Sequence, residues 1–174
     1  GFSELKKLRG FSELIPEPLA NATPERPACQ ACGLYRGCRN PFTVADVPTD
    51  WDHHLLLVGE APTLDEDYRK GKPLSGKAGA VLRWVLAKVG FVQRNCAYTH
   101  AVRCAPPKDA QGKHTAPSMA QTRYCRPFLL EELRRLKPKN VMGLGTAAVH
   151  SFQNDGGATV VSTRGRPLTI VETK

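Results

Sequence analysis

Four of the six cysteines have a spacing that suits metal chemistry. Cys29 and Cys32 form a C-x-x-C pair, Cys104 lies just before two prolines, and Cys125 falls on an expected amphipathic helix. Iron–sulfur clusters require thiolate ligands, and a [4Fe–4S] cluster takes four. A compact zinc ribbon would normally close with a second tight pair. The spacing therefore favours an iron–sulfur cluster, with a zinc site, or unconnected core or disulfide cysteines, as the alternatives.

The charge balance points to a polyanionic partner. The chain has 25 Lys and Arg against 16 Asp and Glu, a formal net charge of +9. Such an excess is typical of proteins that bind DNA or RNA. A basic surface that serves only solubility is the alternative.

The length and the pattern of apolar residues limit which class of protein this chain can be. A chain of 174 residues is long enough for one domain with a proper core. No apolar run approaches the length of a membrane span, and the first residues lack the apolar core of a signal peptide. We therefore expect no membrane partner, reduced thiols and a cytoplasmic location, in a bacterial or phage-infected cell.

The pattern of apolar residues predicts strands that alternate with helices. A helical lead-in and a proline-rich linker are expected over residues 1–28, before the main domain over 29–174. Ser118 and Gln121 form a capping box for a helix that ends before Pro138. Strands are expected at residues 54–58, 97–102, 141–144, 159–162 and 168–171, and helices at 76–90, 118–136 and 146–152.

This alternation predicts an α/β fold, with a parallel sheet between two layers of helices. In such sheets the ligand binds beyond the carboxyl ends of the strands. Three loops meet that condition: GEAPTLDED after the first strand, THAVRCAPP after the second and GLGTA after the third. The functional site is expected there.

The motifs in these loops resemble the family-4 uracil-DNA glycosylases. They are GEAP-x3-ED, GKP-x-x-GKAG, YT-x-AVRC-x-PP, C-R-P-x-L and LG-x-x-A, and they follow in the family's order. The segment CGLY-x-x-C is most similar to the glycosylase-like domain associated with phage-type DNA polymerases. The resemblance implies a three-layer parallel-sheet sandwich with a [4Fe–4S] cluster on Cys29, Cys32, Cys104 and Cys125. Cys38 is not a usual ligand, and Cys96 is expected in the core.

The resemblance also implies a reaction, the hydrolysis of the N-glycosidic bond of a flipped uracil in DNA. This reaction needs a carboxylate near the sugar, which develops positive charge, and donors for the departing base. By resemblance Gly59, Glu60 and Ala61 lie against the base, and Glu60 and Glu66 are the catalytic candidates, with Glu66 handling water. From its sequence context alone, the acidic run at 65–67 is instead typical of a solvated loop or a helix N-terminus.

Three positions depart from the family pattern. The phenylalanine that stacks on uracil is Leu74 here, and the asparagine that reads uracil is His100. The glycine that closes GEAPG is Thr63. A neutral imidazole has its donor and its acceptor on opposite edges, and so it cannot copy the paired donor and acceptor of an amide. The family's His-Pro-Ser motif is not present before Lys174, so we expect either a fragment of a longer protein or an incomplete site.

Two functions follow as expectations. One is an active glycosylase that excises uracil or a related deaminated base. The other is a catalytically degenerate module that binds DNA or docks a DNA polymerase. In either case basic residues near the site loops are expected to contact phosphates: Lys70, Lys72, Lys77, Arg103, Lys108, Arg126 and Arg164.

Overall fold

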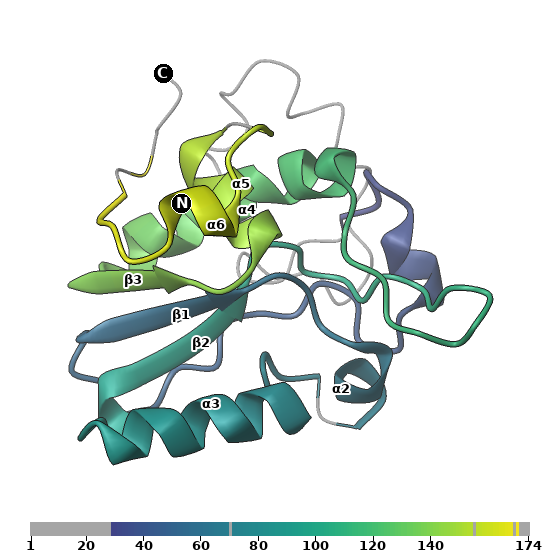
Figure 1. Ribbon diagram of the computed structural model, residues 1–174. Coiled ribbons are helices and arrows are strands. Elements are labelled where there is room, and N and C mark those ends of the chain that lie inside the picture. Colours follow the sequence, from purple (N-terminus) through teal and green to yellow (C-terminus); the bar gives the residue numbers. More distant parts are fainter. Residues whose placement is uncertain (1–28, 70, 155, 169, 171–174) are drawn as a thin grey trace.

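The computed structural model describes residues 29–69, 71–154, 156–168 and 170, and its centre is a three-stranded parallel sheet (Figure 1). The strands are β1 (Leu55–Gly59), β2 (Cys96–His100) and β3 (Asn140–Gly143), in the order β2-β1-β3. Leu55 lies opposite Cys96 on one side and Asn140 on the other. The three predicted strands are confirmed, each displaced by one or two residues.

Helices lie on both faces of the sheet (Figure 1). The first part of the chain adds a 3₁₀ turn, η1 (Leu34–Gly37), and a short helix, α2 (Leu64–Arg69). One face of the sheet carries α3 (Lys77–Lys88), which a second 3₁₀ turn, η2 (Gln93–Asn95), connects to β2. The other face carries α4 (Met119–Leu136), α5 (Thr146–Gln153) and α6 (Val160–Thr163). The predicted three-layer α/β arrangement is therefore confirmed.

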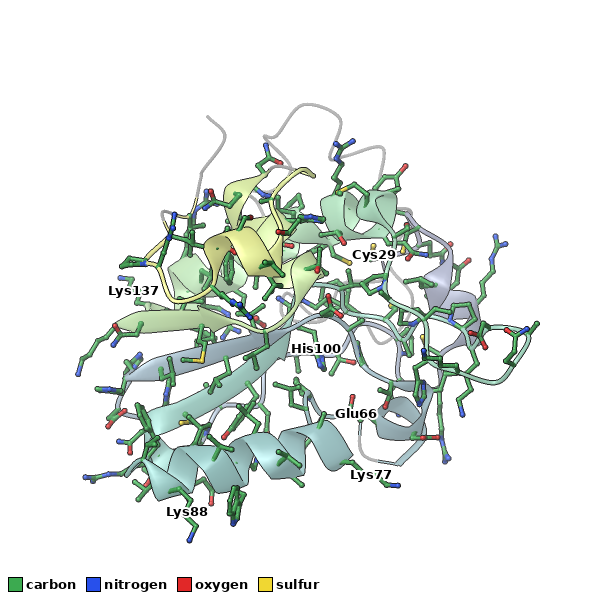
Figure 2. All side chains as sticks on the ribbon, viewed as in Figure 1. Cys29, Glu66, Lys77, Lys88, His100 and Lys137 are labelled. Atoms are coloured by element: carbon green, nitrogen blue, oxygen red, sulfur yellow. The ribbon has the colours of Figure 1, made fainter. Side chains whose placement is uncertain are left out.

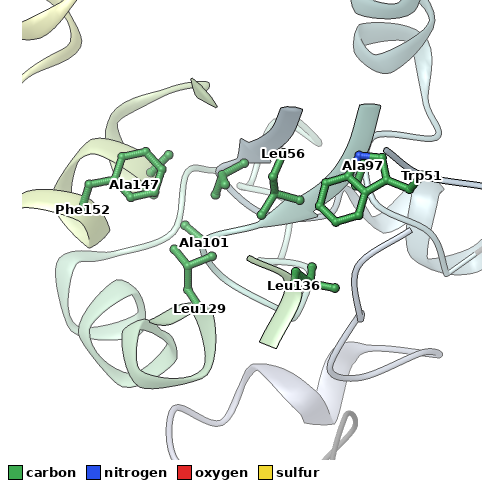
Figure 3. Packing of buried hydrophobic residues seen from close by; sticks show 10 residues of the cluster. Trp51, Leu56, Ala97, Ala101, Leu129, Leu136, Ala147 and Phe152 are labelled. Atoms are coloured by element: carbon green, nitrogen blue, oxygen red, sulfur yellow. The ribbon is translucent and has the colours of Figure 1, made fainter. Parts of the chain in front are cut away.

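The strands alternate their side chains between two apolar cores. Leu56 and Val58 of β1 pack with Leu129 of α4 and with Phe152 of α5 (Figure 3). Leu55 and Leu57 pack on the opposite face with Leu86, Cys96 and Tyr98. All five residues of β1 are buried, as expected for a central parallel strand. The predicted core position of Cys96 is confirmed, because its exposed fraction is 1%.

The capping box of α4 is confirmed. The backbone N–H of Gln121 donates to Ser118 Oγ at 3.2 Å, and the N–H of Ser118 donates to Gln121 Oε1 at 2.7 Å. The helix ends at Leu136, and Lys137 follows in the left-handed conformation with φ 48°. Within the described residues, no helix is long and apolar enough to cross a membrane.

The two predicted C-terminal strands do not agree with the structure. Residues 160–163 form α6, because Thr159 caps a helix: its Oγ1 accepts the backbone N–H of Ser162 at 3.1 Å. This local hydrogen bond outweighs the β-propensity of the two valines. Leu168 and Ile170 are not in a strand, and the other two residues of that prediction, like the expected segment 1–28, lie outside the described residues.

A buried ion pair joins the loop after β2 to α4. Arg103 Nη2 donates to Glu132 Oε2 at 2.8 Å, and Arg103 Nη1 donates to Oε1 at 3.0 Å. Thr99 Oγ1 donates to Glu132 Oε2 at 2.7 Å, and the backbone N–H of Ala45 donates to Oε1 at 3.3 Å. The side chains of Arg103 and Glu132 are 1% and 8% exposed. The pair therefore holds three distant segments together away from water.

We expect Arg103→Met to lower the free energy of unfolding by about 3–5 kcal/mol, because it leaves the Glu132 carboxylate buried without its partner. Lys72→Met is the matched control, since it breaks the exposed pair Lys72–Asp46 at 3.0 Å and should cost less than about 1 kcal/mol. Urea unfolding measures both. Equal losses in the two variants would contradict a special role for the buried pair.

Candidate active site

The three loops that follow the strands lie side by side, as the sequence predicts. The carbonyl oxygens of Gly59 and Glu60 accept the backbone N–H groups of Ala101 and Val102, each at 2.8 Å. The carbonyl oxygen of Val58 accepts the N–H of Leu144, also at 2.8 Å. The parallel ladder thus continues past the ends of the strands and brings the loop motifs to one edge of the sheet.

His100 lies at this edge (Figure 2), where its ring and the Leu74 side chain both meet Gly59. A Cβ atom added to Gly59 would lie 2.7 Å from His100 Cδ2 and 3.2 Å from Leu74 Cδ2, so only glycine fits there. His100 is 1% exposed, and its Nδ1 has no hydrogen-bond partner among the described residues. Burial, with a further effect of the Arg103 charge, lowers the pKa of His100 from 6.5 to about 3. The imidazole is therefore neutral at physiological pH.

The backbone at Leu74 is fixed from α3. Leu74 has φ 50°, a left-handed conformation that is costly for leucine. Its carbonyl oxygen lies against α3 at Gly79, where an added Cβ would be only 1.6 Å away. Arg83 Nη1 donates to this carbonyl oxygen at 2.5 Å, while the Arg83 guanidinium lies 4.1 Å from the centre of the Tyr98 ring. Gly79 and Arg83 therefore hold the Leu74 side chain next to Gly59.

Glu66 connects two helix N-termini. Its Oε2 accepts the backbone N–H of Thr63 at 2.9 Å, and its Oε1 accepts the N–H of Gly76 at 2.8 Å. Thr63 Oγ1 accepts the N–H of Glu66 in return, at 3.2 Å. Glu66 is 6% exposed. A buried carboxylate with both oxygens engaged by backbone donors is better suited to positioning these loops than to handling water.

Glu60 lies at the N-terminus of α5. Its Oε1 accepts the backbone N–H of Ala147 at 3.1 Å, where the helix dipole favours a negative charge. Gly145 has φ 98°, and a Cβ added there would lie 2.4 Å from Glu60 Cγ. Glu60 is only half-buried, unlike Glu66, so its carboxylate is the one that water and a substrate can approach.

The cysteines predicted as metal ligands gather on the other side of the first loop. Cys104 and Cys125 are buried in one apolar cluster, against which Cys32 and Cys38 pack, together with Ala61 of the GEAP loop. Cys29 lies near enough to Cys125 for the two to influence each other's charge. The backbone N–H of Phe42 donates to Cys104 Sγ at 3.3 Å. The structure thus brings together thiols from three segments that are far apart in the sequence.

Cys104 and Cys125 are held in their protonated form. Burial, with the nearby Cys29 and Cys32, raises the pKa of Cys125 to about 12. A hydrogen bond with Cys38, followed by burial, raises the pKa of Cys104. Such thiols ionise only when a cation replaces their protons. Within the part of the chain that the structure describes, no group of three or more His, Cys, Asp or Glu residues is arranged to hold a metal ion.

Two of the predicted phosphate contacts need correction. Arg103 is 1% exposed and paired with Glu132, and Arg126 is 6% exposed with its Nε donating to the carbonyl oxygen of Ser151 at 2.8 Å. Neither guanidinium is available to a phosphate in this structure. Lys70 lies outside the described residues. The remaining predicted contacts are exposed: Lys72, Lys77, Lys108 and Arg164.

Sequence reasoning missed the residues that position the site. Thr63 departs from the family pattern, yet Thr63-x-x-Glu66 has the spacing of a capping box, and this spacing is the signal for its role. Gly145 lies in the LG-x-x-A motif, but its contact with Glu60 cannot be read from the motif. No sequence pattern indicates the role of Arg83, because its partner is a backbone oxygen nine residues away.

Comparison with known proteins places the chain in a family. Residues 48–173 match the model of the uracil DNA glycosylase superfamily. A type-4 uracil-DNA glycosylase from Thermotoga maritima is 28% identical over 140 residues, 80% of this chain and 68% of that protein. One from Archaeoglobus fulgidus is 29% identical over 138 residues, 79% of this chain and 65% of that protein.

A third relative, a type-4 uracil-DNA glycosylase from Pyrobaculum aerophilum, is 30% identical over 119 residues, 67% of this chain and 55% of that protein. The chain thus spans between about half and two thirds of the length of these relatives. The parallel sheet, the loops at its carboxyl edge and the family match agree with one another. This chain belongs to the uracil DNA glycosylase superfamily.

Proposed function

We propose that this chain binds DNA and hydrolyses the N-glycosidic bond of a flipped uracil. The observation that carries the proposal is the meeting of His100 and Leu74 at Gly59, with the Glu60 carboxylate next along the chain at the N-terminus of α5, in a chain of the uracil DNA glycosylase superfamily. The relatives named as type-4 uracil-DNA glycosylases support uracil as the base.

Glu60 is the best candidate for the catalytic carboxylate. As the glycosidic bond breaks, the sugar gains positive charge, and a carboxylate near it stabilises this charge and orients the attacking water. Glu60 can take this role because it stays accessible while the N-terminus of α5 fixes one of its oxygens. Glu66 then acts as a positioning residue, because it joins the loop of Glu60 to the loop of Leu74 through two backbone N–H groups.

His100 favours a second candidate function, that of a degenerate module which binds DNA, or docks a DNA polymerase, without excision. Its imidazole is buried and neutral and lies against Gly59. One neutral ring cannot pair with both the oxygen and the N–H of uracil at the same edge. Leu74 also lacks the aromatic stacking that contributes roughly 1–3 kcal/mol per base. The two functions differ in chemistry and share the fold.

We further propose a [4Fe–4S] cluster on Cys29, Cys32, Cys104 and Cys125. Four soft thiols from three segments, one of them accepting a backbone N–H, form a donor set that fits an iron–sulfur cluster. The cluster would tie the segment before η1 to α4 and to the loop after β2. Cys38 is not included, because its Sγ donates to the carbonyl oxygens of Leu34 and Ala105.

An oligonucleotide with one deoxyuridine tests excision. We expect conversion to an alkali-labile abasic site, and we expect Glu60→Gln to slow it by about 10²–10⁴ without loss of folding, as for a general base. Glu66→Gln should instead lower the stability to urea, because an amide cannot accept both backbone N–H groups.

If wild type binds DNA but excises nothing, the second function holds, and His100→Asn should then restore some excision. Strong wild-type excision that His100→Ala leaves unchanged would contradict this assignment of the base site.

The buried histidine predicts a specific loss of stability in acid. Because the pKa of His100 falls from 6.5 to about 3 on folding, only the unfolded chain takes up the proton between these values. His100 therefore has no effect on the free energy of unfolding above pH 6.5. Below that pH it lowers this free energy by about 1.4 kcal/mol per pH unit, which is roughly 2 kcal/mol at pH 5. Urea unfolding gives the free energy of unfolding at pH 7 and at pH 5. In His100→Asn the difference between these two free energies should shrink by about this amount. An unchanged difference would show that His100 is accessible to protons.

The cluster has a direct assay. Protein purified without oxygen should be brown, with broad absorbance near about 400 nm and about four iron and four sulfide per chain. Cys104→Ser should lose the iron, whereas Cys96→Ser and Cys38→Ser should keep it. One zinc per chain without iron would contradict the proposal.

A further inference from the structure

The outer surface of α3 is unusually apolar. Of the eight large hydrophobic residues that are exposed in the described part of the chain, three lie on this helix, a fourth is its C-cap residue and a fifth follows soon after. We call the four the α3 ridge: Val81, Trp84, Val85 and Val89, with exposed fractions of 63%, 63%, 45% and 65%. Leu82 and Leu86 already supply the contact with the sheet, so the ridge is not needed for it. Clusters of this kind mark interaction surfaces.

The ridge lies within the most basic part of the chain. Between residues 68 and 108 there are nine Lys and Arg and no Asp or Glu, whereas the remaining 16 Lys and Arg equal the 16 Asp and Glu elsewhere. The whole net charge of +9 therefore comes from this segment. Lys77 and Lys88 stand at the two ends of α3 (Figure 2), and Lys88 Nζ lies 5.6 Å from the centre of the Trp84 ring.

We propose that the α3 ridge binds an acidic amphipathic helix of another protein. Its apolar side chains would cover the valines and Trp84, and its flanking carboxylates would meet Lys77 and Lys88. A second copy of this chain fits less well, because the lysines of two ridges would repel each other. DNA fits less well because Trp84 is the single member of the ridge that could stack on a base, and the three valines offer no stacking surface. The proposal is independent of base excision.

The exposed tryptophan provides the measurement. The chain has two tryptophans, and Trp51 is only 8% exposed. A change in the exposure of the ridge to water is therefore reported by the fluorescence of Trp84. The probe is a synthetic amphipathic helix with leucines on one face and glutamates beside them. We expect it to shift the emission of Trp84 to shorter wavelength and to protect it from iodide. The same peptide with lysines for glutamates should bind at least tenfold more weakly.

Two variants locate the site. Val85→Asp should weaken binding of the glutamate peptide more than tenfold, measured with a label on the peptide. Val161→Asp is the matched control, because Val161 is an equally apolar residue that is 75% exposed on α6, and this variant should bind as wild type does.

Each alternative has its own outcome. Equal binding of the two peptides, no binding of either, or normal binding by Val85→Asp would overturn the proposal. Self-association that Val85→Asp abolishes would assign the ridge to a second copy of the chain. Protection of Trp84 by duplex DNA alone would assign it to nucleic acid. Because none of these measurements uses deoxyuridine, failure here leaves the excision proposal intact, and failure of excision leaves this one intact.

Discussion

The buried pair of Arg103 and Glu132 is the interaction on which the site depends. Arg103 lies between His100, at the end of β2, and Cys104, in the cysteine cluster. Its guanidinium is fixed by Glu132 of α4 and by Thr99, and its own backbone oxygen accepts the N–H of Thr43 at 2.8 Å. One charged side chain thus lies between His100 on one side and the thiols on the other, and it is fixed to both α4 and β2. Its charge also helps to keep His100 neutral.

Glutamates at helix N-termini organise the rest of the site. Glu60 accepts a backbone N–H at the start of α5. Glu66 caps α2 and also holds the N–H of Gly76 in front of α3. In both cases the partners are backbone N–H groups that a helix leaves without internal acceptors. The loops are therefore fixed by their own helices rather than by a network of side chains, and the accessible carboxylate is left with little freedom to move.

The sequence revealed those features that depend on neighbours along the chain. The apolar runs identified β1, β2 and β3, and the pair Ser118 and Gln121 placed the start of α4, because these signals are local. Arg103 shows the limit: a charged residue after a strand looks like a surface cation unless Glu132, 29 residues later, is known to face it. Thr159 shows a second limit, since the same β-branched residue that favours a strand can cap a helix. The convergence of the loops was predictable from the topology, but the closure of His100 over Gly59 was not, because it depends on side-chain packing across two strands.

Gly145 limits how this chain can vary in sequence. Its φ of 98° excludes most side chains, and the Glu60 carboxylate occupies the space that any Cβ would need. These two requirements are independent, so a change that relieved one would still violate the other. A residue with no functional group is thereby as constrained as the glutamate beside it. In a library of all single substitutions, position 145 should be as depleted as a reacting residue, although it contributes only empty space.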